Sequence, residues 1–164
     1  MKVVADRLRD IALHSNLDHE IDLFGRSAFN RYYYAAYLAV RKNLMEINSD
    51  WATAAHKNLP TILTIAINKS ATRIAINLTK KGILTKSEES RILTSIKICG
   101  YELSKILQSG YEARSYADYF PEEIVTRESG NLSLHNYTTH EAQSWPKRAE
   151  KHAVQLLNIW RQLG

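Results

Sequence analysis

Cysteine, proline and glycine are all scarce in this chain. Its 164 residues include one cysteine, three prolines and six glycines. A single cysteine excludes an internal disulfide framework, and Cys99 falls at helical spacing among apolar residues, where a thiol packs as a small hydrophobic group. We interpret Cys99 as a core residue rather than a reactive thiol, and we expect the chain to reside in a reducing cytoplasm.

Long hydrophobic runs are also missing. The first ten residues, MKVVADRLRD, carry charges where a signal peptide needs an apolar core. No stretch approaches the roughly 20 apolar residues of a membrane-spanning helix. We therefore expect neither export nor membrane insertion.

The sequence lacks the familiar signatures of several enzyme classes. It has no glycine-rich phosphate loop, no HExxH zinc motif, no cysteine pair and no nucleophile elbow. Its six histidines do not stand at metal-ligand spacing with carboxylates. We expect no metal and no cofactor.

Positive charge is concentrated in the middle of the chain. The formal net charge is +5, and residues 57–111 hold nine basic but only three acidic side chains. Such an excess attracts phosphate groups, but it is also an ordinary property of a solvated helix surface. Both interpretations remain open from charge alone.

The apolar periodicity predicts an all-α fold. The predicted helices cover about residues 3–15, 26–47, 60–82, 85–110 and 138–160, and we expect them to form one domain over 1–164, an antiparallel bundle of four to five helices. The remaining stretch, about 111–137, is predicted to be one long connection. Connections of this length are uncommon in compact domains unless they carry a function.

Several local signals support these boundaries. The patterns Thr85-Lys86-Ser87-Glu88 and Thr138-Thr139-His140-Glu141 are typical capping boxes. Gly110 is predicted to end the fourth helix, and Pro146 predicts a kink or a late start in the last one. A break is also predicted at Asn68–Ser70. The first helix is expected to bury Val4, Leu8 and Ile11.

A tyrosine-rich segment stands out on the second predicted helix. Its residues are Asn30-Arg31-Tyr32-Tyr33-Tyr34-Ala35-Ala36-Tyr37. Tyr33 and Tyr37 lie one turn apart and are expected to pack inward, while Tyr32 and Tyr34 point elsewhere. Arg31 is expected to lie beside the buried stripe, where it needs a carboxylate or phosphate partner.

A second segment, Tyr111 to Tyr119, is predicted to follow the end of the fourth helix. Arg114 and Asp118 either pair and fix a loop, or Arg114 is held at the helix end for phosphate contacts while Tyr116 or Tyr119 stacks or donates a hydrogen bond. The sequence leaves both alternatives open.

These blocks resemble the HEPN superfamily (higher eukaryotes and prokaryotes nucleotide-binding domain). Asn30-Arg31 with Tyr33-Tyr34-Ala35 is similar to the family's Ser-Arg-x-Tyr-Tyr-Ala block, His56-Lys57 is similar to its His-Lys pair, and residues 114–119 resemble its Arg-x-x-Ala-Asp-Tyr block. The resemblance covers about residues 20–160. It implies a helical fold of a kind widespread in prokaryotic toxin-antitoxin and antiphage-defence systems.

The resemblance also implies an RNA-related activity. Many HEPN proteins are metal-independent endoribonucleases that dimerise and use an Arg-x4-6-His motif. Arg114 occupies the arginine position of this motif, whereas the three positions where its histidine could stand hold Tyr119, Phe120 and Pro121. A tyrosine is a poor general base at neutral pH because its ordinary pKa is about 10.

The resemblance therefore favours a homodimer that binds RNA or nucleotide. An active ribonuclease is one alternative, and a non-catalytic subunit that binds a nucleotidyltransferase antitoxin or a larger defence-complex protein is another. Tyr119 joins Arg114 as a candidate catalytic residue. The candidate binding residues are Arg31, Tyr34, His56, Lys57, Arg114, Tyr116 and Asp118.

Overall fold

The computed structural model describes all residues, 1–164, and the fold is mostly α-helical, as the sequence predicts. The chain divides into two compact units. Unit 1 comprises residues 1–38 and 107–148, and unit 2 comprises residues 39–106 and 149–164. None of the helices combines the length and apolar character needed to cross a bilayer.

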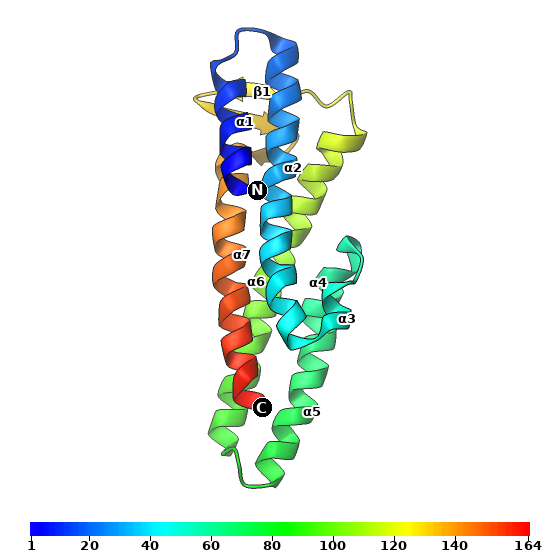
Figure 1. Cartoon of the computed structure of the whole chain (residues 1–164), viewed down its shortest axis with the longest axis vertical. Coiled ribbons are helices and arrows are strands. Elements are labelled where there is room, and N and C mark those ends of the chain that lie inside the picture. Colours follow the sequence, from blue (N-terminus) through cyan, green and yellow to red (C-terminus); the bar gives the residue numbers. More distant parts are fainter. The chain divides into compact units, whose positions relative to one another are not determined.

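Unit 1 begins with two helices that lie side by side (Figure 1). Helix α1 (Lys2–His14) runs along the first half of α2 (Asp18–Ile47), which starts earlier than the predicted residue 26. The Asp6 carboxylate of α1 accepts hydrogen bonds from Tyr32 Oη of α2 at 2.8 Å and from Gln143 Nε2 at 3.1 Å. Gln143 belongs to α7 (Thr139–Trp160), so Asp6 joins three helices.

The prediction that Gly110 ends a helix is wrong. Helix α6 (Lys86–Tyr119) continues nine residues further, and Gly110 lies inside it against Tyr33 and Trp145. A Cβ at Gly110 would come within 2.8 Å of Tyr33 Cδ2 and 3.4 Å of Trp145 Cε3. This glycine therefore serves close packing of α6 rather than helix termination.

The predicted long connection over 111–137 is also wrong. Its first part is helical, and its last part forms a small antiparallel sheet in the order β1-β2-β3, which comprises β1 (Thr126–Glu128), β2 (Asn131–Leu134) and β3 (Tyr137–Thr138). Leu132 and Leu134 of β2 are fully buried. The backbone N–H of Leu132 donates to Thr139 Oγ1 at 3.1 Å, which ties the sheet to the start of α7.

Unit 2 contains the later halves of α2 and α7, the first half of α6 and a series of short helical segments. These segments are α3 (Ser49–Ala52), the 3₁₀ turn η1 (His56–Asn58), α4 (Leu59–Thr61), the π-helical turn η2 (Ile62–Ala66), α5 (Ile67–Lys80) and the 3₁₀ turn η3 (Arg161–Leu163). The predicted break at Asn68–Ser70 is absent, because α5 runs through it. The irregularity lies instead in the π-helical turn just before it.

The buried face of that region steps by four residues throughout. Its members are Leu59, Leu63, Ile67, Ala71 and Ala75, all buried. Leu63 approaches α6 so closely that a Cβ at Gly100 would overlap its carbonyl oxygen. A glycine is required where these two backbones cross.

Most predicted core stripes and caps are confirmed. Phe29, Tyr33 and Val40 on α2 are buried, as are Ile92, Cys99 and Leu103 on α6. Thr85 N donates to Glu88 Oε2 at 2.8 Å and Glu88 N donates to Thr85 Oγ1 at 3.2 Å, which completes the first capping box. In the second, Glu141 N donates to Thr138 Oγ1 at 3.2 Å. Helix α7 starts at Thr139 and includes Pro146, so the start is not late.

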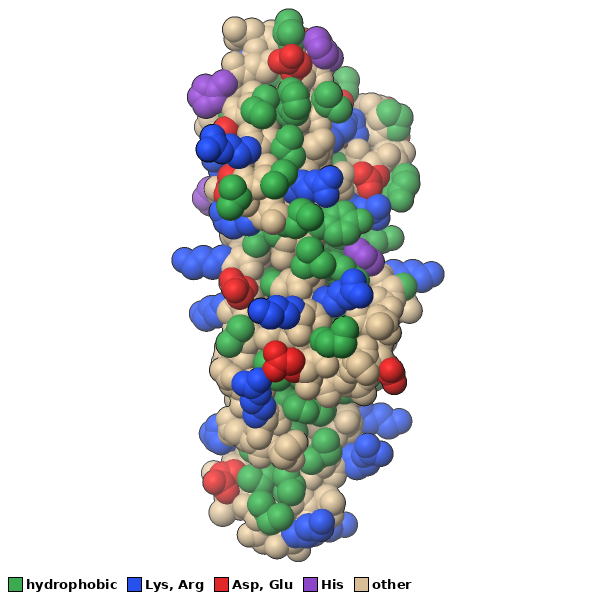
Figure 2. All heavy atoms as spheres, viewed as in Figure 1, with side chains coloured by type: hydrophobic (Ala, Val, Ile, Leu, Met, Phe, Trp, Pro, Cys, Tyr) green, Lys and Arg blue, Asp and Glu red, His purple; other side chains and the backbone are tan.

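The inward face predicted for the first helix is wrong. Ala5 and Ala12 are the buried residues of α1, whereas Val4 and Ile11 are 47% and 46% exposed and Leu8 is only partly covered. Hydrophobic side chains accordingly gather over α1 and the first half of α2 on the face in Figure 2. The small alanines let α1 approach its neighbours, and the larger aliphatic side chains face outward.

Candidate functional site

The candidate site is built around Arg114 near the C-terminal end of α6. Arg114 and Asp118 are one turn apart, which brings them to the same face of the helix. Arg114 Nε lies 2.8 Å from Asp118 Oδ2, an ion-pair contact whose angle departs from that of an aligned hydrogen bond. Asn30 Nδ2 of α2 donates to the other carboxylate oxygen at 2.6 Å. Asp118 is thus held from two helices.

Tyr119 completes the surroundings of the guanidinium. The guanidinium carbon of Arg114 lies 5.5 Å from the centre of the Tyr119 ring, within cation–π range. Burial alone would lower the pKa of Arg114, but Asp118, Tyr34 and Tyr119 outweigh it, so that the pKa is raised. Arg114 is mostly covered, with 19% of its side chain exposed, whereas Tyr119 is 65% exposed. The result is a fixed, charged guanidinium under an accessible aromatic ring.

The tyrosine-rich segment of α2 forms an aromatic cluster on unit 1. Tyr33 lies edge-on to Tyr34 and to Tyr111, with ring centroids 5.5 and 6.1 Å apart, and Tyr37 lies 6.1 Å from Tyr33. Burial and the neighbouring Tyr37 raise the pKa of Tyr33, while Arg114 opposes this rise. Tyr33 is therefore a neutral core residue, whereas Tyr34 and Tyr111 are partly exposed.

Two expectations for this segment need correction. Tyr32 does not point away from the core but is fully buried, although its hydroxyl does reach a polar partner, Asp6. Arg31 is exposed rather than set beside the buried stripe, so it needs no internal partner. An exposed arginine at this position is free to meet a ligand, but the fold does not depend on it.

Another aromatic group lies on α6 at Tyr116. The rings of Tyr116 and His135 are stacked, with centroids 4.1 Å apart and planes at 18°. His135 stands in the β2–β3 turn, and its Nδ1 lies 3.5 Å from Glu123 Oε2. The turn of the sheet thus places a histidine beside the C-terminal end of α6. Because Arg114 and Tyr116 are separated by about 200° around the helix, the two groups face different directions.

Arg26 is a structurally important residue that sequence reasoning missed. Its Nε pairs with Asp22 at 2.8 Å, and its Nη1 donates to the carbonyls of Tyr116 at 3.2 Å, Ala117 at 3.1 Å and Phe120 at 3.2 Å. Its Nη2 donates to the Glu123 carbonyl. Arg26 therefore satisfies the free carbonyls at the end of the helix that carries Arg114. The only sequence signal was the Asp22–Arg26 spacing of four, which is common on helices.

The remaining candidates, His56 and Lys57, lie in unit 2. Both belong to η1, where His56 is half-buried and Lys57 is exposed. Unit 2 also has a basic groove of about 300 Å³ on α5, lined by Ala66, Lys69, Ser70 and Arg73. Of the eight predicted site residues, Arg31, Tyr34, Arg114, Tyr116, Asp118 and Tyr119 belong to unit 1. Among these, the structure joins Arg114, Asp118 and Tyr119 directly.

No group of three or more histidine, cysteine, aspartate or glutamate side chains has a geometry that could hold a metal ion. No protein-family model, curated protein or solved structure shows a significant similarity to the chain.

Proposed function

We propose that this chain is a HEPN-like protein of a prokaryotic toxin-antitoxin or antiphage-defence system, which acts in the cytoplasm and binds single-stranded RNA or nucleotide as a dimer. The observation that carries the proposal is the fixed Arg114 guanidinium beneath the exposed ring of Tyr119, 5.5 Å away. The resemblance of residues 30–37, 56–57 and 114–119 to HEPN motifs supports the assignment to that superfamily.

The chemistry of this pair suits a nucleotide. A guanidinium has five N–H donors, and since Asp118 and Tyr119 engage only some of them, others remain for phosphate oxygens. An exposed tyrosine ring offers a face on which any base can stack, which is how sequence-tolerant proteins hold single strands. Asp118, itself held by Asn30, fixes the guanidinium in advance, which reduces the entropy lost on binding.

Binding is favoured over cleavage because the motif's histidine is replaced. Tyr119 stands in its range, and a neutral phenol is a poor base. The ribonuclease alternative needs a histidine beside Arg114, and His135 of the same copy does not lie there, because it stacks on Tyr116, two residues along α6. Because these residues face different sides of α6, a cleaving site would need a histidine from elsewhere, such as the second copy of a dimer.

The test combines binding and cleavage in one sample. A fluorescein-labelled single-stranded RNA is titrated with protein in EDTA, its anisotropy is recorded, and the RNA is then run on a denaturing gel. Arg114→Ala should weaken binding about tenfold or more, since a hydrogen bond to a charged group contributes roughly 1.5–3 kcal/mol. Arg7→Ala, an exposed arginine of the same unit, should leave the affinity unchanged.

Intact RNA with Arg114-dependent binding supports the proposal. Cleavage by the wild type that is lost in Arg114→Ala, and also in His135→Ala or His56→Ala, would establish the ribonuclease alternative instead. Equal affinity of wild type and Arg114→Ala would remove Arg114 from the site and overturn the proposal.

The partner-binding alternative is favoured by a different observation. Helix α1 and its N-cap residue expose an apolar stripe suited to another protein surface, in which Met1, Val4 and Ile11 are 55%, 47% and 46% exposed. Light scattering after size exclusion tests whether this stripe joins two copies. A dimer that becomes a monomer in Val4→Gln/Ile11→Gln would place the homodimer interface there, whereas a monomeric wild type would leave the stripe for a nucleotidyltransferase or defence-complex partner.

A further inference from the structure

The small sheet of unit 1 has an open edge at β1. In the order β1-β2-β3, strand β1 pairs only with β2, in the register Thr126↔Ser133, Arg127↔Leu132 and Glu128↔Asn131. The two-residue turn between them has positive φ at Ser129 (49°) and Gly130 (78°), as tight hairpin turns require. Glu128 and Asn131 therefore form the hydrogen-bonded pair that closes the turn, and the pairs alternate from there. The N–H and C=O of Arg127 consequently point away from β2, toward the open edge.

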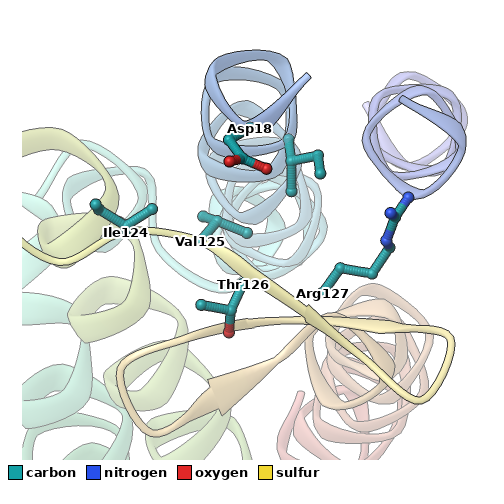
Figure 3. A pocket seen from close by; sticks show the side chains of 6 residues that line it. Asp18, Ile124, Val125, Thr126 and Arg127 are labelled. Carbon is teal, nitrogen blue, oxygen red and sulfur yellow. The ribbon is translucent and has the colours of Figure 1, made fainter. Parts of the chain in front are cut away.

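A cavity lies beside this edge. It has a volume of about 430 Å³ and is bounded by the first turn of α2 and by residues 124–127 (Figure 3). Its apolar lining is Ile21, Val125 and the 62% exposed Ile124. This volume lies within the usual range for sites that bind small ligands.

The charge of the groove comes from Asp18. Arg127 turns its guanidinium away from the cavity, toward α1 (Figure 3), and donates to the carbonyls of Leu13 at 2.8 Å and Ser15 at 2.9 Å. Asp18, on the first turn of α2, lines the groove and makes no side-chain hydrogen bond or ion pair within the chain. The open edge is thus flanked by apolar surface and one unpaired carboxylate.

We propose that the groove between α2 and the open edge of β1 binds an extended peptide segment of a partner protein, which adds a strand to β1 and places a lysine or arginine beside Asp18. The backbone groups of Arg127 supply two hydrogen bonds, the apolar lining accepts one side chain of the added strand, and Asp18 selects a cationic neighbour. This site is independent of the Arg114 site.

Charge argues for a peptide rather than a second copy of the chain. Pairing of two β1 edges around a two-fold axis would bring two copies of Asp18 to the same groove, and like charges at close range are unfavourable. The first turn of α2 also borders the groove in each copy (Figure 3). If two β1 edges paired, the α2 helices of the two copies would therefore face each other at close range. A single basic, extended segment has neither conflict.

The probe is a fluorescein-labelled peptide, acetyl-Lys-Val-Thr-Val-Lys-amide, titrated against the full-length protein and followed by fluorescence anisotropy and by amide NMR. Binding should shift the amide signals of residues 124–127 and slow hydrogen exchange at the Arg127 N–H. Asp18→Asn should weaken binding about threefold to fivefold, the usual contribution of an exposed ion pair. Asp50→Asn, a first-turn aspartate of α3, should not change the affinity.

Two altered peptides test the mode of binding. A version with glutamate in place of lysine should bind more weakly, and one that is N-methylated at alternate residues should lose binding because it cannot complete the strand hydrogen bonds. Any of three results would overturn the proposal: no binding of the basic peptide at millimolar concentration, equal affinity for all three peptides, or peptide-free dimerisation that buries the Arg127 amide. Melting curves confirm that Asp18→Asn is folded.

Discussion

At the scale of single residues, Gly100 shows how one missing side chain fixes a helix crossing. Gly→Ala in a helix interior normally stabilises a protein by roughly 1 kcal/mol. Here a Cβ would overlap the Leu63 carbonyl oxygen, a backbone atom that cannot rotate away. We predict that Gly100→Ala destabilises the protein by about 1–3 kcal/mol, measured by urea unfolding.

The control for this prediction is Thr94→Ala on an exposed position of the same helix. It should leave the free energy of unfolding unchanged or raise it by a few tenths of a kcal/mol. A neutral or stabilising Gly100→Ala would mean that α6 and the π-helical turn are further apart than described.

Sequence reasoning was most accurate where burial follows periodicity. Cys99 is buried, and its burial raises the pKa of the thiol, in keeping with a core role. Sequence reasoning failed where side-chain size competed with periodicity. On α1, the stripe with Val4 and Ile11 fits a helix face, but close helix packing selected the alanines instead. Nothing in the sequence alone distinguishes these two faces.

At the scale of elements, the end of α6 depends on an arginine from another helix. Arg26 donates to the carbonyls of Tyr116, Ala117 and Phe120 and pairs with Asp22, which in turn accepts from Val125 N at 2.8 Å. We predict that Arg26→Ala costs about 1.5–3 kcal/mol and speeds hydrogen exchange over residues 117–125. Hydrogen-exchange mass spectrometry measures this.

The matched variant is Arg26→Lys, which keeps the charge but has a single donor group in place of the fork. It should recover only part of the lost stability. Equal behaviour of both variants and the wild type would show that the α6 end is held by its own backbone turns.

Asp6 connects three elements through one carboxylate, and its effect on stability should depend on pH. Burial alone would raise the pKa of Asp6, but hydrogen bonds from Lys2, Tyr32 and Gln143 lower it below the ordinary 3.8. A carboxyl group with a lowered pKa in the folded state stabilises the protein above its unfolded pKa, and this stability is lost as the pH falls through the folded value.

We therefore predict that Asp6→Asn destabilises the protein by about 1 kcal/mol at neutral pH and that the difference from wild type shrinks below about pH 4. Thermal melts at several pH values provide the measurement. Asp10→Asn, a carboxyl group paired with Arg9 on the surface of the same helix, should show a smaller effect. A difference that grows on acidification would contradict the described contacts.

The sheet explains why the long connection was misread. Two hairpins with two-residue turns fit into thirteen residues, so no strand exceeds four residues. Strands this short are too brief to show a recognisable alternation of apolar and polar residues. The Ser129-Gly130 pair was the usable signal, since such dipeptides favour tight turns. The first capping box, by contrast, was predicted correctly, and the second in its Thr138 half, because both partners lie within four residues of sequence.

At the scale of the whole molecule, charge sets the expected response to salt. The chain carries a formal charge of +5, and α5 adds an accessible groove with Lys69 and Arg73. In Figure 2, Lys and Arg side chains are spread along the visible face rather than gathered in one patch. Contacts between these side chains and a nucleic acid backbone would therefore be spread along the surface rather than concentrated at one patch.

If RNA binds, we predict that the logarithm of its affinity falls linearly with the logarithm of salt concentration, by about 0.7 per phosphate neutralised on a single strand. Lys69→Ala/Arg73→Ala should reduce this slope by about 1 to 1.5. Glu88→Gln/Glu89→Gln is the control pair, which should not reduce it. A slope unchanged by Lys69→Ala/Arg73→Ala would show that the α5 groove does not contact the RNA.

The sequence predicted the helical class of the molecule but not how its candidate site is built. Periodicity located the long helices, but the predicted end at Gly110 left Arg114 and Asp118 outside the helix, and their pairing was only one of two alternatives. The contact that holds the site from a second helix, Asn30 to Asp118, joins residues 88 positions apart, and the separate Tyr116–His135 stack joins residues 19 positions apart. Such pairs depend on packing rather than on local pattern, and no single-sequence rule selects them.

The π-helical turn at Ile62–Ala66 bears on the history of the chain. Each such turn holds one residue more than an α-helical turn, so it can arise by a single-codon insertion within a regular helix. Homologues without that insertion should be one residue shorter between Leu59 and Ile67, and their buried positions there should step by three and four rather than by four and four. An alignment gap of one residue at this place, found in some homologues and not in others, would show on which side of their divergence the extra residue arose.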